Sequence, residues 1–318
     1  MITEKYKGLL AAMSANVIFG LNIPVTKTLV AHWMTPLGYT MTRMFFGTVV
    51  FWFIGSLFKR EKVAGRDLLI IMVGGLIGYL GTQFLFSQSL KYTTPVIFAL
   101  LIALTPVAAL LLSAVFLKEV VSRRKISGIV LSISGAFLII LESGNGSAGA
   151  NNFLGILLVL LCVFFYAGYL VITRNVATKY SPVTVAKWMF LISAFVMLPW
   201  SFSELATQRI YSHESTVHAF SLLSFALFFS TTLAFFLMPL ALKKLEASTV
   251  SIFMNCQPVV ASIVAIWAGQ DTLTWTKGLA ALLVLTGVYR VSVKKIQSIR
   301  CEIPVKARAR KVQSFNQA

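Results

Sequence analysis

Charged residues are scarce in this sequence, since only 12% of its 318 residues are Asp, Glu, Lys or Arg. A soluble protein carries about 25%. The mean hydropathy is +0.83 and 58% of the residues are hydrophobic, which is more apolar surface than a soluble fold can cover with polar groups. The composition therefore excludes a soluble fold and predicts that lipid surrounds most of the chain.

Acids, histidines and cysteines are also few. The ten acidic residues all fall in predicted loops or at the ends of apolar runs, so no carboxylate stands mid-membrane, where proton-coupled carriers commonly place one. The three cysteines and three histidines show no metal or disulfide spacing, and no glycine-rich phosphate loop is present. We therefore predict no metal site, no cofactor and no ATPase activity.

What the sequence does contain is ten apolar runs. Each is about long enough for a helix that crosses a membrane, which needs about 20 residues. Inside lipid the backbone polar groups must bond within their own segment, and this requirement favours helices. The predicted spans are 8–31, 37–58, 68–90, 95–117, 124–141, 153–173, 183–203, 219–241, 247–268 and 275–293.

The 28 basic residues lie mostly between the runs and predict the orientation of the chain. With the N-terminus in the cytoplasm, 22 of them fall on the cytoplasmic side and three on the outer side, while Lys27, Arg43 and Lys187 lie within spans. Cytoplasmic loops carry the excess of Lys and Arg. We therefore predict an even number of spans with both termini inside, and a topological role for the net charge of +18 in place of nucleic-acid binding.

The two halves of the chain match each other at a shift of 152 residues. Pro106 falls on Pro258, Glu119 on Asp271 and Gly135 on Gly287. Five spans per half turn the second half upside down, so Glu119 is predicted on the cytoplasmic side and Asp271 outside. Such inverted repeats are a recurrent plan of secondary transporters. The predicted division is 8–141 for the first five-helix repeat, 142–152 for an external linker, 153–293 for the second repeat and 294–318 for a basic cytoplasmic tail.

The repeated segments resemble the EamA domains of the drug/metabolite transporter superfamily. The first half reads ALLIALTPVAALLLSAVFLKE and then ISGIVLSISG, and the second reads NCQPVVASIVAIWAGQD and then LAALLVLTG. The family pattern has a proline inside a helix, a glutamate at its end, and two glycines seven residues apart in the next helix. The first half fits with Pro106, Glu119, Gly128 and Gly135, and the second has Pro258 and Gly287 but Asp271 and Ala280 at the other two positions.

This resemblance implies an all-helical membrane protein of ten helices that exports or exchanges a metabolite, often an amino acid or a related compound. It also implies a central cavity lined by the third, fourth, eighth and ninth helices, with the first, second, sixth and seventh moving as gates. The localisation it implies is the bacterial inner membrane. The sequence leaves open whether the chain forms a homo-oligomer.

Polar groups inside a membrane span are functional candidates by default. Hydrogen bonds between helices, worth about 1 kcal/mol each, are the alternative for the amides, and core packing is the alternative for the tyrosines. Arg43 could bind a substrate carboxylate or act in gating, and Pro258 deprives the carbonyl of Met254 of its helical donor. The candidates for the substrate cavity are Asn16, Asn22, Arg43, Tyr79, Gln83, Thr105, Pro106, Tyr166, Tyr169, Lys187, Asn255, Gln257 and Pro258.

The sequence thus predicts a secondary transporter that works by alternating access. A membrane-embedded transferase is one alternative, but such an enzyme needs acids and histidines clustered at one face, and the sequence shows no such cluster. A structural or sensory membrane protein is the other alternative, and the inverted duplication argues against it.

The predicted topology can be checked with reporter fusions. Reporters at positions 62, 122, 244 and 305 should report the cytoplasm, because these positions follow or precede the basic segments, and reporters at 147 and 211 should report the outside. A cytoplasmic signal at position 147 would contradict the arrangement of five spans plus five.

Overall fold

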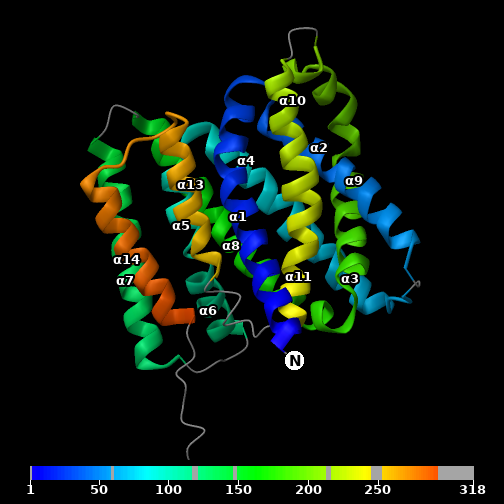
Figure 1. Cartoon of the computed structure of the whole chain (residues 1–318), viewed down its shortest axis with the longest axis horizontal. Coiled ribbons are helices and arrows are strands. Elements are labelled where there is room, and N and C mark those ends of the chain that lie inside the picture. The colour runs from blue at the N-terminus through cyan, green and yellow to red at the C-terminus, as the bar shows by residue number, and fades with distance from the viewer. Residues whose placement is uncertain are drawn as a thin grey trace, which may run out of the picture.

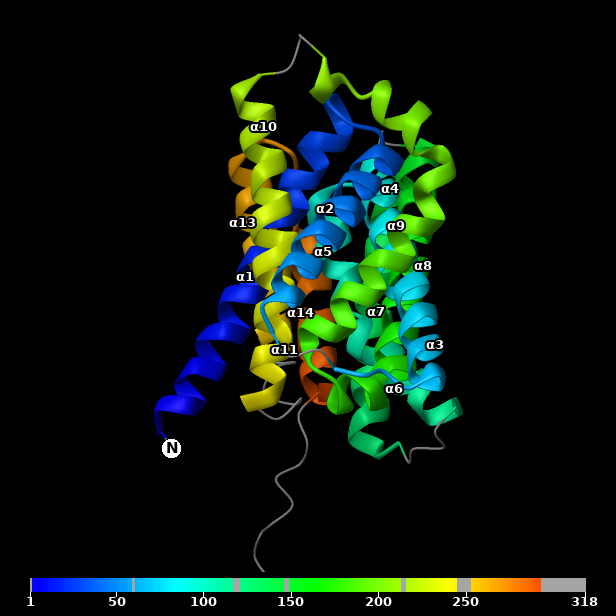
Figure 2. The same cartoon turned by 90° about the vertical axis from the view of Figure 1, so that its right-hand side faces the viewer.

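The computed structural model describes residues 2–58, 61–116, 121–145, 149–212, 216–244 and 253–292, and every element in these ranges is a helix. Figures 1 and 2 show the helices running side by side in one bundle. Large apolar side chains cover its outside, and Trp267 and Phe202 are each 87% exposed. A surface of this kind suits lipid and confirms an integral membrane protein.

The first half begins with two long helices and ends with another. Its elements are α1 (Ile2–His32), α2 (Pro36–Ser56), α3 (Gly65–Gly74), the π-helical segment η1 (Gly75–Gly81), α4 (Thr82–Tyr92), α5 (Pro95–Ile102), α6 (Thr105–Phe116) and α7 (Arg123–Asn145). The second half has α8 (Gly149–Lys179), α9 (Pro182–Ala206), the 3-10 turn η2 (Arg209–Tyr211), α10 (Val217–Ser224), the π-helical segment η3 (Phe225–Leu233), α11 (Ala234–Lys244), α13 (Cys256–Trp267) and α14 (Trp275–Ser292).

Eight stretches of the described chain are long and apolar enough to cross a membrane. The ninth predicted span is described only from residue 253, where α13 has 12 residues, and the tenth corresponds to α14, which has 18 residues and carries Lys277 and Arg290. The total of ten spans therefore stays a prediction.

Helix also occupies much of the predicted linker 142–152, because α7 continues to Asn145 and α8 begins at Gly149. Glu119 and the tail 294–318 lie outside the described residues.

Three of the helices begin with the same local sequence, a Thr or Ser followed by a proline. Thr35, Thr94 and Ser181 stand before Pro36, Pro95 and Pro182, and each of the three hydroxyls accepts a hydrogen bond from a backbone N–H in the first turn. Proline suits the first helical position, since its fixed φ is helical and its missing N–H would have no partner there. These caps place the entry of each helix, including the second helix of both halves.

The duplication read from the sequence is visible in the order of the elements. A shift of 152 residues carries α3, η1 and α4 (Gly65–Tyr92) onto α10, η3 and α11 (Val217–Lys244). The π-helical segment η1 then falls on residues 227–233, inside η3. Segments of π-helix are rare and often lie at functional sites. Their recurrence at equivalent positions supports a common origin of the two halves.

Equivalent helices also make equivalent contacts across the bundle. Helix α1 packs on α11 while α4 packs on α8, and α1 packs on α13 while α6 packs on α8. Because α1 corresponds to α8 and α4 to α11 in the two halves, each pair of contacts is one interaction made twice. Figure 1 shows α7 and α14 together at one side of the bundle and α2 with α9 at the other.

The glycines of the repeat motif bring α7 and α14 into direct backbone contact. A β-carbon added at Gly287 would lie 2.5 Å from the carbonyl oxygen of Gly128, and one added at Gly135 would lie 2.9 Å from that of Ala280. The shift of 152 residues carries Gly128 onto Ala280 and Gly135 onto Gly287, so the two contacts map onto each other. Small residues at such positions let membrane helices approach closely.

Enlarging Gly287 should therefore destabilise the protein. We expect Gly287→Val to lower stability by about 1–3 kcal/mol, the usual cost of overpacking, because the backbone of Gly128 cannot move aside. Gly278→Val is the matched control, since Gly278 lies in the same helix with open space around it. The melting temperature of the two variants in detergent, with their folded yields, measures the difference. Equal loss in both variants would show that helix propensity, not the contact with α7, governs the effect.

Candidate functional site

Two helices of the bundle are interrupted at positions that the duplication relates. The first break, at Ala103 and Leu104, separates α5 from α6, and the second, at Asn255, precedes α13. A shift of 152 residues carries Ala103 onto Asn255. Each break lies just before a proline, Pro106 or Pro258, and proline offers no N–H to the carbonyl four residues earlier. The sequence therefore builds the same interruption in each half.

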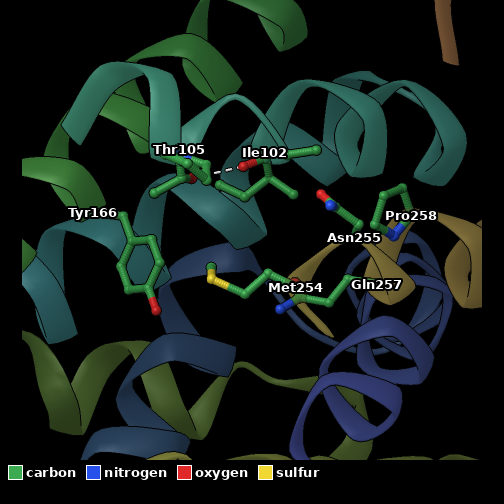
Figure 3. A pocket seen from close by; sticks show the side chains of 9 residues that line it. Ile102, Thr105, Tyr166, Met254, Asn255, Gln257 and Pro258 are labelled. Carbon is green, nitrogen blue, oxygen red and sulfur yellow. Dashed lines mark hydrogen bonds between the residues drawn. The ribbon is translucent and has the colours of Figure 1, made fainter. Parts of the chain in front are cut away.

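The two breaks face each other across a small pocket (Figure 3). Its volume is about 30 Å³, and a water molecule needs roughly 10–15 Å³ on this measure. In this conformation the pocket is therefore too small for a metabolite of several heavy atoms. None of its lining residues is charged. They are Ile102, Ala103, Thr105, Pro106, Tyr166, Met254, Asn255, Gln257 and Pro258.

Six of the residues predicted from the sequence lie in this pocket, and their role in binding stays a prediction. The pocket also contains three apolar residues that were not among the predicted cavity residues, Ile102, Ala103 and Met254. Only their place three or four residues before a proline within a span could have marked them. The six predicted residues are Thr105, Pro106, Tyr166, Asn255, Gln257 and Pro258.

The helices that line the pocket differ in part from those that the family resemblance implies. The fourth and ninth helices contribute through the two breaks, as expected. The sixth helix, expected to be a gate, contributes Tyr166 from α8, whereas the third and eighth contribute none of the lining residues. In Figure 3 the side chain of Met254 points toward Tyr166, which closes one end of the pocket.

Two hydrogen bonds organise the polar groups of the pocket. The Thr105 hydroxyl donates to the carbonyl oxygen of Ile102 at 2.6 Å, the carbonyl that Pro106 leaves without its helical donor. On the other side, the Gln257 side chain donates through Nε2 to Oδ1 of Asn16 in α1 at 2.6 Å. Asn16 is completely buried, so this predicted residue supports the pocket from behind without lining it.

Tyr79 and Tyr169 belong to an aromatic cluster beside the pocket. The rings of Tyr166 and Tyr169 stack at 5.8 Å between centroids, and Tyr169 meets Tyr79 edge-on at 6.0 Å. Tyr79 also packs against Phe190 at 4.7 Å and Phe235 at 4.9 Å. Packing therefore accounts for Tyr79 and Tyr169, and of the three tyrosines only Tyr166 lines the pocket.

Arg43 and Gln83 lie together, away from the pocket, in a junction between the two halves. Arg43 projects from α2, is only 1% exposed and donates from Nη1 to Oε1 of Gln83 in α4. It also donates from Nε to the Thr231 hydroxyl at 2.8 Å and from Nη2 to the Ser230 hydroxyl at 3.3 Å, both in η3. Its guanidinium lies 5.5 Å from the ring of Tyr39. These partners are all neutral, so dipoles alone balance this buried charge within the described part of the chain.

The π-helical turn of η3 explains why Thr231 can accept from Arg43. The Thr231 hydroxyl donates to the carbonyl of Ala226 at 2.9 Å, five residues earlier, and so uses its one proton on the widened turn. Its lone pairs are then free for the guanidinium. The irregular helix and the buried charge thus depend on each other.

Asn22 and Lys187 lie apart from the pocket as well. Asn22 is buried, and among the described residues no donor meets its Oδ1. The ammonium nitrogen of Lys187 lies 5.4 Å from the ring centroid of Trp52 and 5.9 Å from that of Trp188. Since Trp52 is 40% exposed, Lys187 belongs to the outside of the bundle, where a long basic side chain can reach toward the interface.

The acid of the second repeat motif lies in an unexpected environment. An acid at the end of a span is expected to meet water, but the side chain of Asp271 is only 3% exposed. The ammonium of Lys277 lies 2.6 Å from its Oδ1, while Oδ2 has no partner among the described residues. The described residues also include no group of three or more His, Cys, Asp or Glu side chains that could hold a metal ion.

Comparison with known proteins shows to which family this structure belongs. The model of the EamA-like transporter family matches residues 6–141 and again residues 153–293. The chain belongs to the EamA-like transporter family. This match confirms the resemblance read from the repeat motif. It makes the chain a multi-pass membrane protein of a transporter family, not a member of an enzyme family.

Relatives within the EamA-like transporter family are distant in sequence but match most of the chain. An uncharacterized transporter of Bacillus subtilis (strain 168), YyaM, is 26% identical over 231 residues, covering 71% of this chain and 74% of its own. A protein of Streptantibioticus cattleyicolor with the name "Probable terminal-alkyne amino-acid exporter" is 27% identical over 237 residues, covering 73% and 76%. One crystal structure, 18% identical, covers 89% of this chain and 95% of its own with a TM-score of 0.61, and so shares the fold.

Removing the charge of Arg43 should abolish transport without preventing membrane insertion. In Arg43→Ala the guanidinium that donates to Gln83 in α4 and to the hydroxyls of η3 is lost. These former acceptors are neutral and can bond to one another. Lys187→Ala is the control, because that half-buried lysine packs on Trp52 and Trp188 at the outer surface of the bundle and does not line the pocket. Membrane yield and substrate exchange in proteoliposomes measure both variants. Normal exchange by Arg43→Ala would remove Arg43 from the transport mechanism, and loss of the protein from the membrane would assign it to folding.

Proposed function

We propose that this protein is a secondary transporter that exports or exchanges a small metabolite across the bacterial inner membrane by alternating access. The observation that carries the proposal is the meeting of two proline-broken helices, one from each half, at a single uncharged pocket. Inverted-repeat transporters bind substrate near the mid-membrane, at the interface of the repeats and between discontinuous helices. The two breaks that line the pocket belong to different halves, and this supports the proposal.

The lining favours an amino acid with an apolar side chain as the substrate. Apolar surface comes from Ile102, Ala103 and Met254, and hydrogen-bonding groups come from Thr105 and Gln257. A pocket with apolar walls and a few placed polar groups is typical of small-molecule sites. The name of the Streptantibioticus cattleyicolor relative, which refers to an amino acid with an alkyne, is consistent with this class.

Transport requires the pocket to widen, because 30 Å³ does not hold an amino acid. The contacts that must change include the bond between Asn16 and Gln257, which joins α1 to α13, and the bonds of Arg43 to η3. At the level of whole helices the other half has equivalent contacts, since α8 packs on α6 and α9 packs on η1. Closing one set while the other opens is how two similar, oppositely directed halves give access to each side in turn.

The same geometry argues for transport driven by the substrate's own gradient. Among the described residues, no acidic or basic side chain lines the pocket, and a carrier driven by protons commonly places a titrating carboxylate within its spans. Lys27 is the alternative proton carrier, since its ammonium donates to the carbonyls of Leu90 and Thr93 inside the protein. Exchange should therefore proceed without an imposed pH gradient.

Counterflow in proteoliposomes tests the proposal. A panel of L-amino acids that includes L-norvaline is tested one at a time. Vesicles loaded with the unlabelled amino acid should take up the same amino acid in labelled form, with no pH gradient. Ala103→Leu should reduce this exchange at least about tenfold, because the larger side chain fills the pocket. Ala268→Leu is the matched control, since Ala268 is exposed at the end of α13.

Each outcome bears on a different part of the proposal. Absence of exchange for every amino acid by the unmodified protein would refute the substrate class. Full exchange by Ala103→Leu would show that substrate passes elsewhere. Accumulation that requires a pH gradient would refute the driving force and direct attention to Lys27.

A further inference from the structure

The hydrogen bonds behind the pocket determine which atom of the Gln257 amide can meet a ligand. Asn16 lies in α1 with its amide nitrogen Nδ2 2.7 Å from the carbonyl oxygen of Ala12. A backbone carbonyl can only accept a hydrogen bond, so the amide group that meets it must be the NH2 group. The oxygen Oδ1 of Asn16 therefore points the other way, toward Gln257.

The same reasoning applies to the next bond in the chain. The Asn16 oxygen can only accept, so the atom of Gln257 that lies 2.6 Å from it must be Nε2. Rotating the Gln257 amide would bring two oxygens together. Its Oε1 is thus left as the polar atom that faces away from Asn16, and among the described residues no donor bonds to it. The backbone of α1 has fixed the polarity of a side chain that lines the pocket.

The Thr105 hydroxyl oxygen is also left as an acceptor, but for a different reason. Its single hydroxyl proton is used in the bond to the Ile102 carbonyl, so the oxygen presents only lone pairs to the pocket. Across the pocket, Pro258 leaves the carbonyl of Met254 without its helical donor. Tyr166 and Asn255 can each donate or accept. The atoms whose role is fixed by the structure are therefore acceptors.

We propose that the Gln257 oxygen, oriented by Asn16, and the Thr105 oxygen together form an acceptor site that selects ligands with an amino group. The inference rests on the proposed transport function and names the part of the substrate that the pocket recognises. An ammonium group offers three N–H donors to these oxygens, and hydrogen bonds with a charged partner are the stronger kind. A compound with the same carbon chain but no amino group offers these oxygens no donor, which is costly. Asn16 acts as a positioning residue for this selectivity.

The test compares L-norvaline with pentanoate, which has the same carbon chain without the amino group. Each compound competes with labelled L-norvaline in counterflow, and the ratio of their half-inhibitory concentrations measures the preference for the amino group. We expect the unmodified protein to prefer L-norvaline at least about tenfold. In Gln257→Met and in Asn16→Leu this preference should fall about tenfold, although the two changes lie on different helices.

Matched variants separate selectivity from general damage. Asn175→Leu makes the same change at an exposed position and should keep the full preference. Thr105→Ser retains the hydroxyl and should keep it, whereas Thr105→Val should lose part of it. The variants at Asn16 and Gln257 and the variants at Thr105 test the acceptor site independently. If a variant of one set fails to fold, the other set still tests the preference for the amino group.

The outcomes also separate this inference from the proposed function. Equal inhibition by L-norvaline and pentanoate in an unmodified protein that exchanges norvaline would overturn the acceptor site and leave the transporter intact. An unchanged preference in Asn16→Leu would overturn the positioning role of Asn16. If the unmodified protein exchanges no L-norvaline at all, the proposed substrate class fails and the acceptor site fails with it.

Discussion

A backbone surrounded by lipid must find partners for its own N–H and C=O groups, and this constraint decides where the chain can depart from regular helix. In the described chain the departures are the two proline breaks and the two π-helical segments. Side-chain hydroxyls bond carbonyls at several of these places, as Thr105 does to Ile102, Thr82 to Ile77 and Thr231 to Ala226. Each irregularity therefore comes with a local polar group, and these groups are the ones available for function.

The duplication makes each departure occur twice. The two halves contact each other differently on the two sides of the bundle. On the side of α7 and α14, glycines press backbone against backbone, and Gly128 meets Gly287 with no room for a β-carbon. On the side of α2 and η3, the halves meet through hydrogen bonds of Arg43 to Ser230 and Thr231. Close backbone packing at glycines allows only one relative position of α7 and α14. The hydrogen bonds of a cation to neutral groups can instead be exchanged for bonds to other partners. This contrast suits a protein in which one side holds the halves together while the other side permits movement.

The pocket lies between the two proline breaks. The helix breaks supply its polar groups, the aromatic cluster from Tyr166 to Tyr79 supports its wall, and α1 orients Gln257 through Asn16. Its small volume in this conformation follows from the close packing of the helices around it.

Much of the architecture could be predicted from the sequence, because lipid imposes strong and local rules. Run length predicted the helices, and the shift of 152 residues related the two halves from the sequence alone. The sequence also marked the carbonyl of Met254 beside the second break, since Pro258 offers it no N–H. Helix ends were less predictable, and α7 and α8 extend into the segment predicted as a linker, because polar residues such as Asn and Ser can continue a helix once it is formed.

Side-chain partnerships across helices were decided by the tertiary structure alone. The sequence placed Arg43, Gln83, Asn16 and Gln257 together as polar residues within spans, but it could not separate the pair beside the pocket from the pair at the junction of α2, α4 and η3. It also did not predict that Asp271 is enclosed beside Lys277. Local rules act along one helix, whereas the choice of partner depends on how far each helix is rotated and shifted against its neighbours. That rotation results from the packing of the whole bundle, so only the folded chain determines it.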